Sequence, residues 1–253
     1  MTKEQIIYGV HAVLEMLRQR GQTVEEVLVA RGSRGQWFAE VKALAQQQGV
    51  RFRVTDPLQV QRLAGSNKHQ GIVARTSGYE YTDFAEVERR LQEAGPQALA
   101  LVLDCLQDPM NFGNCLRSAA AAGVQGVIIP KDRAVGVTAS VAKAAAGALA
   151  LVPVCRVTNL ATSLHRLKEL GLWLIGAEAT APQPLYAASL TGPLALVIGS
   201  EGQGLRPRVR QACDLLLHIP MATNTLGSYN AATAAGIFLY EIMRQRRIQE
   251  KPT

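Results

Sequence analysis

The second half of the chain alternates continuous apolar runs with segments whose apolar residues recur at helical spacing. These runs lack alternating polar positions, so as strands they would be buried on both faces, as in a parallel sheet covered by helices. The predicted strands are 99–103, 127–129, 152–154, 172–175, 194–198 and 215–217, and the predicted helices are 115–122, 138–149, 160–170 and 231–247. An α/β domain with a parallel sheet is therefore expected.

The first 76 residues repeat the same alternation on a smaller scale. Helical spacing is found in 10–18, 38–47 and 57–63, and extended segments are expected at 24–30, 52–55 and 71–76. A small three-layer α/β unit results. The segment 77–97 contains Gly78, Gly95 and Pro96 around a charged stretch that could form one exposed helix, which is typical of a linker. We therefore expect domains at 1–76 and 98–253, joined by a linker at 77–97.

Positive charge is concentrated in the first unit. The chain has a net charge of +7, and residues 1–76 hold eleven Lys and Arg against six acidic residues, a net of +5. Phosphate backbones are bound largely through such charge, so a polyanion partner is expected, with the front domain as its first candidate. A solubilising surface would explain the charge equally well.

Other sequence features limit the class of protein. The apolar runs are far shorter than the roughly 20 residues that cross a bilayer, and the start Met-Thr-Lys-Glu does not resemble a signal peptide. A cytoplasmic protein with no membrane partner is expected. Its four cysteines form no C-x-x-C pair and have no nearby histidine, so buried thiols are expected rather than a metal site or disulfides.

Three polar loops interrupt the α/β pattern of the second domain. They are 108–119 (DPMNFGNCLRSA), 196–205 (LVIGSEGQGL) and 219–230 (IPMATNTLGSYN). Each lies where an apolar run meets a helix-like run, which is where α/β proteins place ligand-contacting loops. The three loops predict one composite site.

In order and content, these loops resemble the three motifs of the SpoU (TrmH) family of RNA ribose 2′-O-methyltransferases. The segments 6–15 (IIYGVHAVLE) and 69–74 (HQGIVA) resemble the N-terminal RNA-binding domain of one subset of that family. The resemblance covers nearly the whole chain and is strongest to the type that methylates a guanosine of bacterial 23S ribosomal RNA.

Several expectations come from this resemblance alone. It implies a ribosomal-protein L30-like RNA-binding domain and a SPOUT methyltransferase domain with a trefoil knot. S-adenosyl-L-methionine is the implied cofactor, and ribosomal RNA is the implied substrate. A homodimer through the C-terminal domain is also implied, with the last predicted helix at the interface.

The resemblance also implies catalytic residues. These are Asn111, Arg117, Glu201, Ser228 and Asn230. In the family the arginine is taken to activate the ribose hydroxyl, but a guanidinium titrates above about 12 and is a poor base. Clamping a phosphate is an alternative role for Arg117. A structural alternative is that Arg117 lies at a helix start and pairs with Asp108.

The loop 199–204 follows an apolar strand directly, and its glycines allow a backbone to approach a ligand closely. Its G-x-x-G-x-G spacing is not a dinucleotide fingerprint, and Ser200 lacks the G-x-S-x-G elbow of a hydrolase. A plain tight turn would also explain the glycines, and helix capping would explain Ser228. The predicted cofactor-binding residues are Gly199, Ser200, Gly202, Gly204, Ile219, Pro220, Met221, Ser228 and Tyr229.

Three departures from the family pattern concern the adenosine pocket. Tyr229 replaces the usual leucine, the third loop is one residue longer than the commonest spacing, and alanines replace polar positions in 143–150. They leave the shape and affinity of the pocket open.

Five residues are predicted to contact RNA: Arg31, Arg34, Lys68, His69 and Arg206. A solvated turn for the arginines and a structural role for the histidine are the alternatives. Two other functions remain open. One is 2′-O-methylation of transfer RNA or of an antibiotic-binding ribosomal RNA loop, and the other is a non-enzymatic RNA-binding or ribosome-assembly protein with a drifted cofactor loop.

Overall fold

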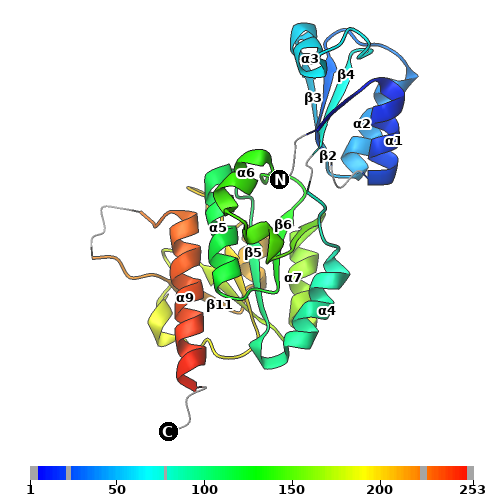
Figure 1. The fold of residues 1–253 in the computed structure, drawn as a ribbon. Helices are drawn as coiled ribbons and strands as arrows, with labels where there is room; N and C mark the ends of the chain where they lie inside the picture. The colour runs from blue at the N-terminus through cyan, green and yellow to red at the C-terminus, as the bar shows by residue number, and fades with distance from the viewer. Residues whose placement is uncertain (1–4, 21–23, 77–78, 223–226, 250–253) are drawn as a thin grey trace. The chain divides into compact units, whose positions relative to one another are not determined.

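The computed structural model describes residues 5–20, 24–76, 79–222 and 227–249 (Figure 1). The chain forms two compact units, 1–81 with 136–139, and 82–135 with 140–253. Most of the segment expected as a linker thus belongs to the second unit. The roles predicted for 1–76 and 98–253 stay predictions.

The first unit is a four-stranded mixed sheet between two helical layers. The strands are β1 (Gln5–Tyr8), β2 (Val24–Ala30), β3 (Arg51–Thr55) and β4 (Ile72–Thr76), in the order β1-β4-β2-β3. Strands β2 and β3 are parallel, and β4 is antiparallel to β1 and β2. The helices are α1 (Val10–Arg20), α2 (Gln36–Gln47) and α3 (Pro57–Ala64).

Two apolar clusters hold this unit together. One joins Leu17 of α1 and Val41 of α2 to Val27 of the sheet, and the other joins Val60 of α3 to Leu28 on the opposite face. The predicted three layers are confirmed. Strand β1 was not predicted, because four residues with two apolar side chains give too short a pattern.

The second unit contains a seven-stranded sheet in the order β7-β6-β5-β10-β8-β11-β9, and every pair is parallel. The strands are β5 (Leu99–Leu103), β6 (Gly126–Pro130), β7 (Val154–Val157), β8 (Trp173–Ala177), β9 (Gln183–Pro184), β10 (Leu194–Ile198) and β11 (Leu215–His218). The prediction of a buried parallel sheet is confirmed. The trefoil knot stays a prediction.

Helices cover both faces of this sheet (Figure 1). They are α4 (Phe84–Ala94), α5 (Pro109–Ala121), α6 (Ala139–Ala145), α7 (Leu160–Glu169), α8 (Pro207–Ala212) and α9 (Ala231–Gln249), with short 3-10 segments at Gly95–Gln97, Ala148–Ala150 and Leu185–Ala187. Helices α5 and α9 lie side by side. In the parts of the chain that the structure describes, no helix is both long enough and apolar enough to span a membrane.

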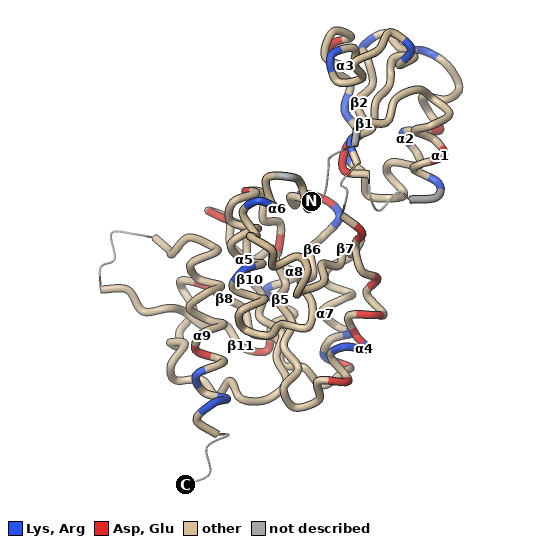
Figure 2. Tube along the Cα trace, in the orientation of Figure 1, with Lys and Arg blue, Asp and Glu red and all other residues tan. Residues whose placement is uncertain are grey.

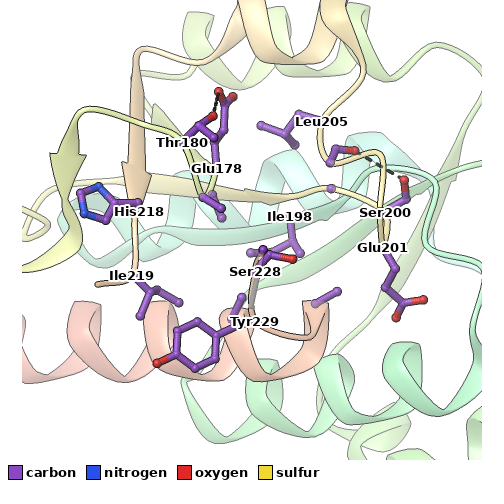
Figure 3. Close-up of a pocket in the computed structure, with 18 of the residues that line it drawn as sticks. Glu178, Thr180, Ile198, Ser200, Glu201, Leu205, His218, Ile219, Ser228 and Tyr229 are labelled. Carbon is purple, nitrogen blue, oxygen red and sulfur yellow. Dashed lines mark hydrogen bonds between the residues drawn. The ribbon is translucent and has the colours of Figure 1, made fainter. Parts of the chain in front are cut away.

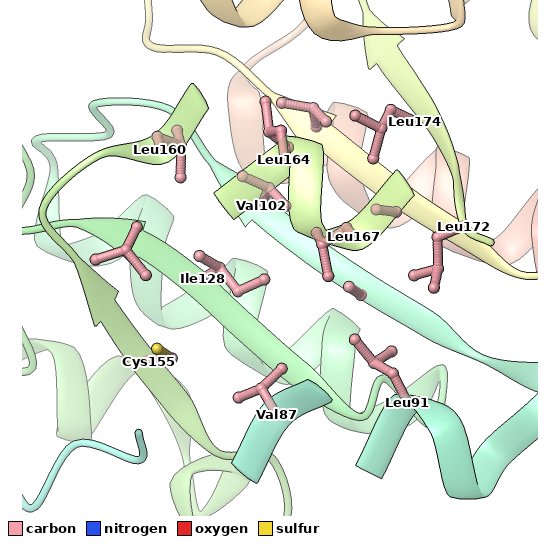
Figure 4. Close-up of a cluster of buried hydrophobic side chains, with 14 of the residues drawn as sticks. Val87, Leu91, Val102, Ile128, Cys155, Leu160, Leu164, Leu167, Leu172 and Leu174 are labelled. Atoms are coloured by element: carbon pink, nitrogen blue, oxygen red, sulfur yellow. The ribbon is translucent and has the colours of Figure 1, made fainter. Parts of the chain in front are cut away.

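Helix α4 is not the exposed linker helix that was expected. Its Val87 and Leu91 are fully buried in a cluster that includes Leu164 of α7, Val102 and Ile128 (Figure 4). The physical reason is that Phe84, Val87 and Leu91 recur at helical spacing beneath the charged residues, which gives the helix an apolar face.

A buried arginine ties the last helix to the start of the first strand in this unit. Arg246 of α9 is 8% exposed and donates hydrogen bonds to the carbonyl oxygens of Gln97 at 2.8 Å, Ala98 at 3.0 Å and Gly192 at 2.7 Å. One side chain therefore holds the chain just before β5 and just before β10.

Candidate functional site

A cavity of about 470 Å³ lies at the carboxyl ends of β8, β10 and β11 (Figure 3). This volume is within the range of small-molecule sites, roughly 300–1,000 Å³. Its walls are the segments 177–180, 198–205 and 217–219 and Met221, together with 227–229 and the first half of α9. Of the nine residues predicted to bind a cofactor, all but Pro220 line this cavity.

The loop after β10 is a tight hairpin whose geometry requires glycine. The Ser200 amide donates to the Gly204 carbonyl at 3.1 Å, and the Gly204 amide donates to the Ser200 carbonyl at 2.9 Å. A Cβ atom on Gly199 would lie 2.5 Å from the Leu205 nitrogen and would also collide with the Gly204 carbonyl. Gly202 has a left-handed φ of +78°. These glycines form a narrow turn that exposes main chain to the cavity.

One wall of the cavity is joined to helix α8 by an ion pair that the sequence prediction missed. Arg210 of α8 donates to both carboxylate oxygens of Glu178, at 2.7 and 3.0 Å, and this pairing lowers the pKa of the Glu178 carboxyl. The signal was present, because Glu178 is the first acidic residue after an apolar run. Its partner, 32 residues later, could not be inferred.

His218, also missed, lines the cavity at the end of β11, and its Nδ1 atom is buried without a hydrogen-bond partner among the described residues. The apolar part of the lining was not predicted either. It consists mainly of Ile198, Leu205, Leu217 and Phe238 beside the predicted residues.

Asn111 joins the three loops. Its side-chain amide donates to Glu201 of the glycine loop, and its side-chain oxygen accepts a hydrogen bond from Asn230 at 3.0 Å. The oxygen of Asn230 in turn accepts from the main-chain amides of Ala232 at 2.9 Å and Thr233 at 3.3 Å. Three of the five predicted catalytic residues therefore form one hydrogen-bonded chain.

The first turn of α9 is capped by Asn230, and the alternative in which Ser228 caps this helix is wrong. Ser228 is exposed and lines the cavity. Part of the third loop, residues 223–226, lies outside the described residues, so its predicted extra residue stays a prediction.

Arg117 does not lie at a helix start. Helix α5 begins at Pro109, six residues before the predicted start, because Asp108 accepts a hydrogen bond from the Asn111 amide at 2.7 Å and Pro109 fits the first helical position. Arg117 is in the third turn, rotated about 120° and displaced about 9 Å along the axis from Asn111. It is exposed and outside the cavity lining. In the described ranges it forms no ion pair with Asp108, which instead caps α5.

Helix α6 crosses α5 at very close range. A Cβ atom on Gly113 would lie 2.9 Å from the Ala145 nitrogen and would overlap Ala144. The alanines of 143–150 therefore allow two backbones to approach. None of these residues lines the cavity, so they do not shape the pocket as the sequence comparison suggested.

Four of the predicted RNA contacts lie at one end of the first sheet. Arg31 and Arg34 are exposed after β2, and Lys68 is exposed before β4. These two loops are joined by a hydrogen bond from the Ala30 amide to the Gly71 carbonyl at 2.8 Å. The fourth residue, His69, accepts a hydrogen bond from the Gly71 amide at 3.0 Å through Nδ1 and so stabilises the turn. Figure 2 shows basic residues along this part of the unit.

The fifth predicted RNA contact, Arg206, belongs to the second unit and is ion-paired. Its Nε atom lies 2.6 Å from Oδ1 of Asp104, whose side chain is fully buried, while the arginine side chain is 39% exposed. The guanidinium is thus anchored on one edge.

The cysteines are unpaired thiols. Three are buried and Cys213 is partly buried. Burial raises the pKa of Cys115, Cys155 and Cys213 to about 12, so they are protonated at neutral pH. Within the described ranges, no three His, Cys, Asp or Glu side chains are grouped as ligands of a metal ion.

Comparison with known proteins gives matches over almost the whole chain. Residues 98–240 match the sequence model of the SpoU rRNA Methylase family, and residues 6–82 match the model described as RNA 2′-O ribose methyltransferase substrate binding. The 23S rRNA (guanosine-2′-O-)-methyltransferase RlmB of Nitrosomonas europaea is 41% identical over 245 residues, which are 97% of this chain and 93% of that protein. RlmB of Xylella fastidiosa is 42% identical and covers 97% of this chain and 98% of its own length.

A solved structure shows the same fold. The SpoU methyltransferase AviRb from Streptomyces viridochromogenes, in complex with the cofactor AdoMet, aligns with a TM-score of 0.62 and 25% identity. The alignment covers 97% of this chain and 91% of that one.

Proposed function

The chain belongs to the SpoU rRNA methylase family, and from this membership we propose that it transfers a methyl group from S-adenosyl-L-methionine to a ribose 2′-hydroxyl of RNA. The proposed substrate is a guanosine of 23S ribosomal RNA, the substrate named for both RlmB relatives. The observation that carries this proposal is the meeting of the loops 196–205 and 219–230 at one cavity, to which the loop 108–119 is linked through Asn111.

The cavity fits the proposed cofactor. Its apolar walls, including Ile198 and Phe238, suit a purine ring, and the main chain of 199–204 and 219–221 offers hydrogen-bonding groups. Thr180 and Ser228 supply hydroxyl groups at the wall. S-adenosyl-L-methionine, when bound, supplies a methyl group on a positively charged sulfur.

The catalytic roles follow from the hydrogen-bonded chain. A ribose hydroxyl must lose its proton as it is methylated, and correct orientation of the reacting groups lowers the barrier. We assign Asn111, Glu201 and Asn230 to holding the glycine loop and the last helix in place beside the cavity, and Ser228 to the cavity wall. Arg117 is assigned to the ribose or its adjacent phosphate, as base or as clamp.

The position of Arg117 supports a homodimer. This residue is exposed on α5 and outside the cavity of its own chain, so we propose that it acts at the cavity of a second subunit. Large apolar side chains on the neighbouring surface support an interface there, because Met110 of α5 is 57% exposed and Tyr240 of α9 is 68% exposed.

The first unit is proposed to bind the RNA. Arg31, Arg34 and Lys68 present positive charge at one end of its sheet, and charge of this kind binds phosphate backbones. With ribosomal RNA as substrate, we place the enzyme in the cytoplasm.

Ribose-methylation mapping of RNA from cells with and without the gene tests the proposed function. One guanosine of 23S ribosomal RNA should lose its 2′-O-methyl group and regain it when wild-type protein, but not the Arg117→Ala variant, is restored. Loss at a transfer RNA position would overturn the ribosomal substrate. No change in any RNA, with ribosomal RNA still bound by the protein, would favour the non-enzymatic alternative.

A further inference from the structure

A buried carboxylate lies at the foot of the glycine loop. Asp104 directly follows β5 and is fully buried. Its Oδ2 atom accepts a hydrogen bond from the Arg206 amide at 2.8 Å, and its Oδ1 atom accepts from Arg206 Nε at 2.6 Å. Its own amide donates to the Ile198 carbonyl at 2.7 Å. One residue therefore holds both ends of the loop, because Ile198 precedes the loop and Arg206 follows it.

The negative charge of the buried Asp104 carboxylate is compensated by Arg206. A carboxylate is stable inside a protein only when hydrogen bonds and an opposite charge replace its water shell. Arg206 supplies both, since its main-chain amide and its guanidinium reach the two oxygens separately. This two-point contact fixes the direction of the chain at Arg206, where α8 begins.

The first turn of α5, which follows Asp104 in the chain, also holds the tip of the loop. Asn111 donates to Glu201, and Asn111 is seven residues after Asp104. The loop is thus attached at its foot by Asp104 and at its tip by Asn111. Residues 199–205 between these points form one wall of the cavity.

We propose that Asp104 is a positioning residue, which acts through Arg206 to hold the glycine loop in the conformation that binds the cofactor. The identity of the cofactor rests on the proposed function, whereas the effect on the loop does not. A purely structural role is the competing explanation, because removing one partner of a buried ion pair destabilises a fold by leaving the other partner uncompensated.

Calorimetry of the full chain with S-adenosylhomocysteine separates the two explanations. In Asp104→Asn one carboxylate oxygen is replaced by an NH₂ group, which is a donor that faces the donors of Arg206. The affinity for S-adenosylhomocysteine should therefore fall about tenfold or more, which corresponds to the loss of one charge-assisted hydrogen bond. The double variant Asp104→Asn with Arg206→Gln can form a neutral amide pair and should recover most of this loss. Glu88→Gln is the matched control, since Glu88 is a partly buried carboxylate paired with Arg166 away from the cavity.

The proposal is overturned if Asp104→Asn binds S-adenosylhomocysteine as tightly as wild type does. It is also overturned if Asp104→Asn and Glu88→Gln lose the same stability and Asp104→Asn loses no more affinity than Glu88→Gln. If Asp104→Asn does not fold, Arg206→Lys replaces it, and unchanged affinity of that variant would equally overturn the proposal.

Hydrogen exchange of the amides in 199–206, measured without ligand, keeps this test independent of the proposed function. Faster exchange in Asp104→Asn than in Glu88→Gln supports the positioning role even if the wild type binds no S-adenosylhomocysteine, in which case only the proposed function fails. Equal exchange in the two variants overturns the positioning role.

Discussion

Replacing Gly199 by alanine tests whether the tight turn after β10 forms the cofactor wall. The added methyl group would lie 2.5 Å from the Leu205 nitrogen and against the Gly204 carbonyl, and backbone atoms cannot rotate away as a side chain can. Overpacking of this kind costs about 1–3 kcal/mol. If the turn opens to relieve it, the two hydrogen bonds between Ser200 and Gly204 are lost, at about 0.5–1.5 kcal/mol each.

If the strain is only partly relieved and both hydrogen bonds are lost, the total is about 2–6 kcal/mol, divided between folding and binding. Because the turn forms a wall of the cavity, we expect at least half of it as lost affinity for S-adenosylhomocysteine, which is roughly fivefold or more. Calorimetry measures the binding part, and urea unfolding measures the loss of stability.

Gly202→Ala is the control from the same loop. Gly202 has a φ of +78° but no atom within 4 Å of an added Cβ, so alanine there costs only the left-handed conformation, about 1 kcal/mol. Its affinity should stay within about threefold of wild type. The reasoning is refuted if Gly199→Ala binds as wild type does, or if Gly202→Ala is the more damaging of the two.

Four further outcomes are expected. Arg117→Ala should abolish methyl transfer while cofactor affinity stays within a few-fold, since this side chain lies outside the cavity; normal turnover would remove it from catalysis. Deleting 1–76 should weaken RNA binding and flatten its dependence on salt, because a net charge of +5 is removed; an unchanged salt slope would assign RNA binding to the other unit. Tyr229→Leu should keep or improve the affinity for S-adenosylhomocysteine, because the predicted contact is main-chain and apolar; calorimetry that shows a clear loss would instead give the aromatic ring a role. Burial raises the pKa of Cys155 from 9.0 to about 12, so between these pH values the thiol loses its proton only in the unfolded state, and the free energy of unfolding falls as pH rises. Urea unfolding measured from pH 8 to 10 should show a smaller fall in this free energy for Cys155→Ala than for wild type. Equal dependence of the free energy of unfolding on pH in the two proteins would contradict the burial effect.

The fold was largely predictable because the strands of the second unit are apolar throughout. Each of the six predicted runs overlaps a strand of the sheet, whereas β9, with two residues, has no periodicity to detect. Helix α5 was placed too late because Pro109, Gly113 and two asparagines interrupt its first turns. The Asp-Pro sequence at its start is a cap signal that could have corrected this.

The cavity was predictable in part, but its apolar lining and its connections were not. Glycines and the Ile-Pro-Met segment marked two walls, because such residues have local conformational reasons to occur at strand ends. The links Asp104–Arg206 and Asn111–Glu201 join residues 102 and 90 positions apart. No local pattern specifies such pairs. The alanines of 143–150 were among the departures that left the shape of the pocket open, and the structure places Ala144 and Ala145 at the close approach to Gly113.

The three carbonyl contacts of Arg246 have a consequence for the order of folding. Two of them join α9 to residues 97–98, just before β5, across 148 to 149 residues, so these contacts can form only after nearly the whole second unit has been synthesised. Contacts of such long range slow folding, because closing the loop between the two residues costs chain entropy before the contact can stabilise the structure. The first unit, with its own core, can fold while the ribosome is still translating the second. The core of the first unit, for which we propose RNA binding, is thus expected to form on the nascent chain before the cavity of the second unit exists.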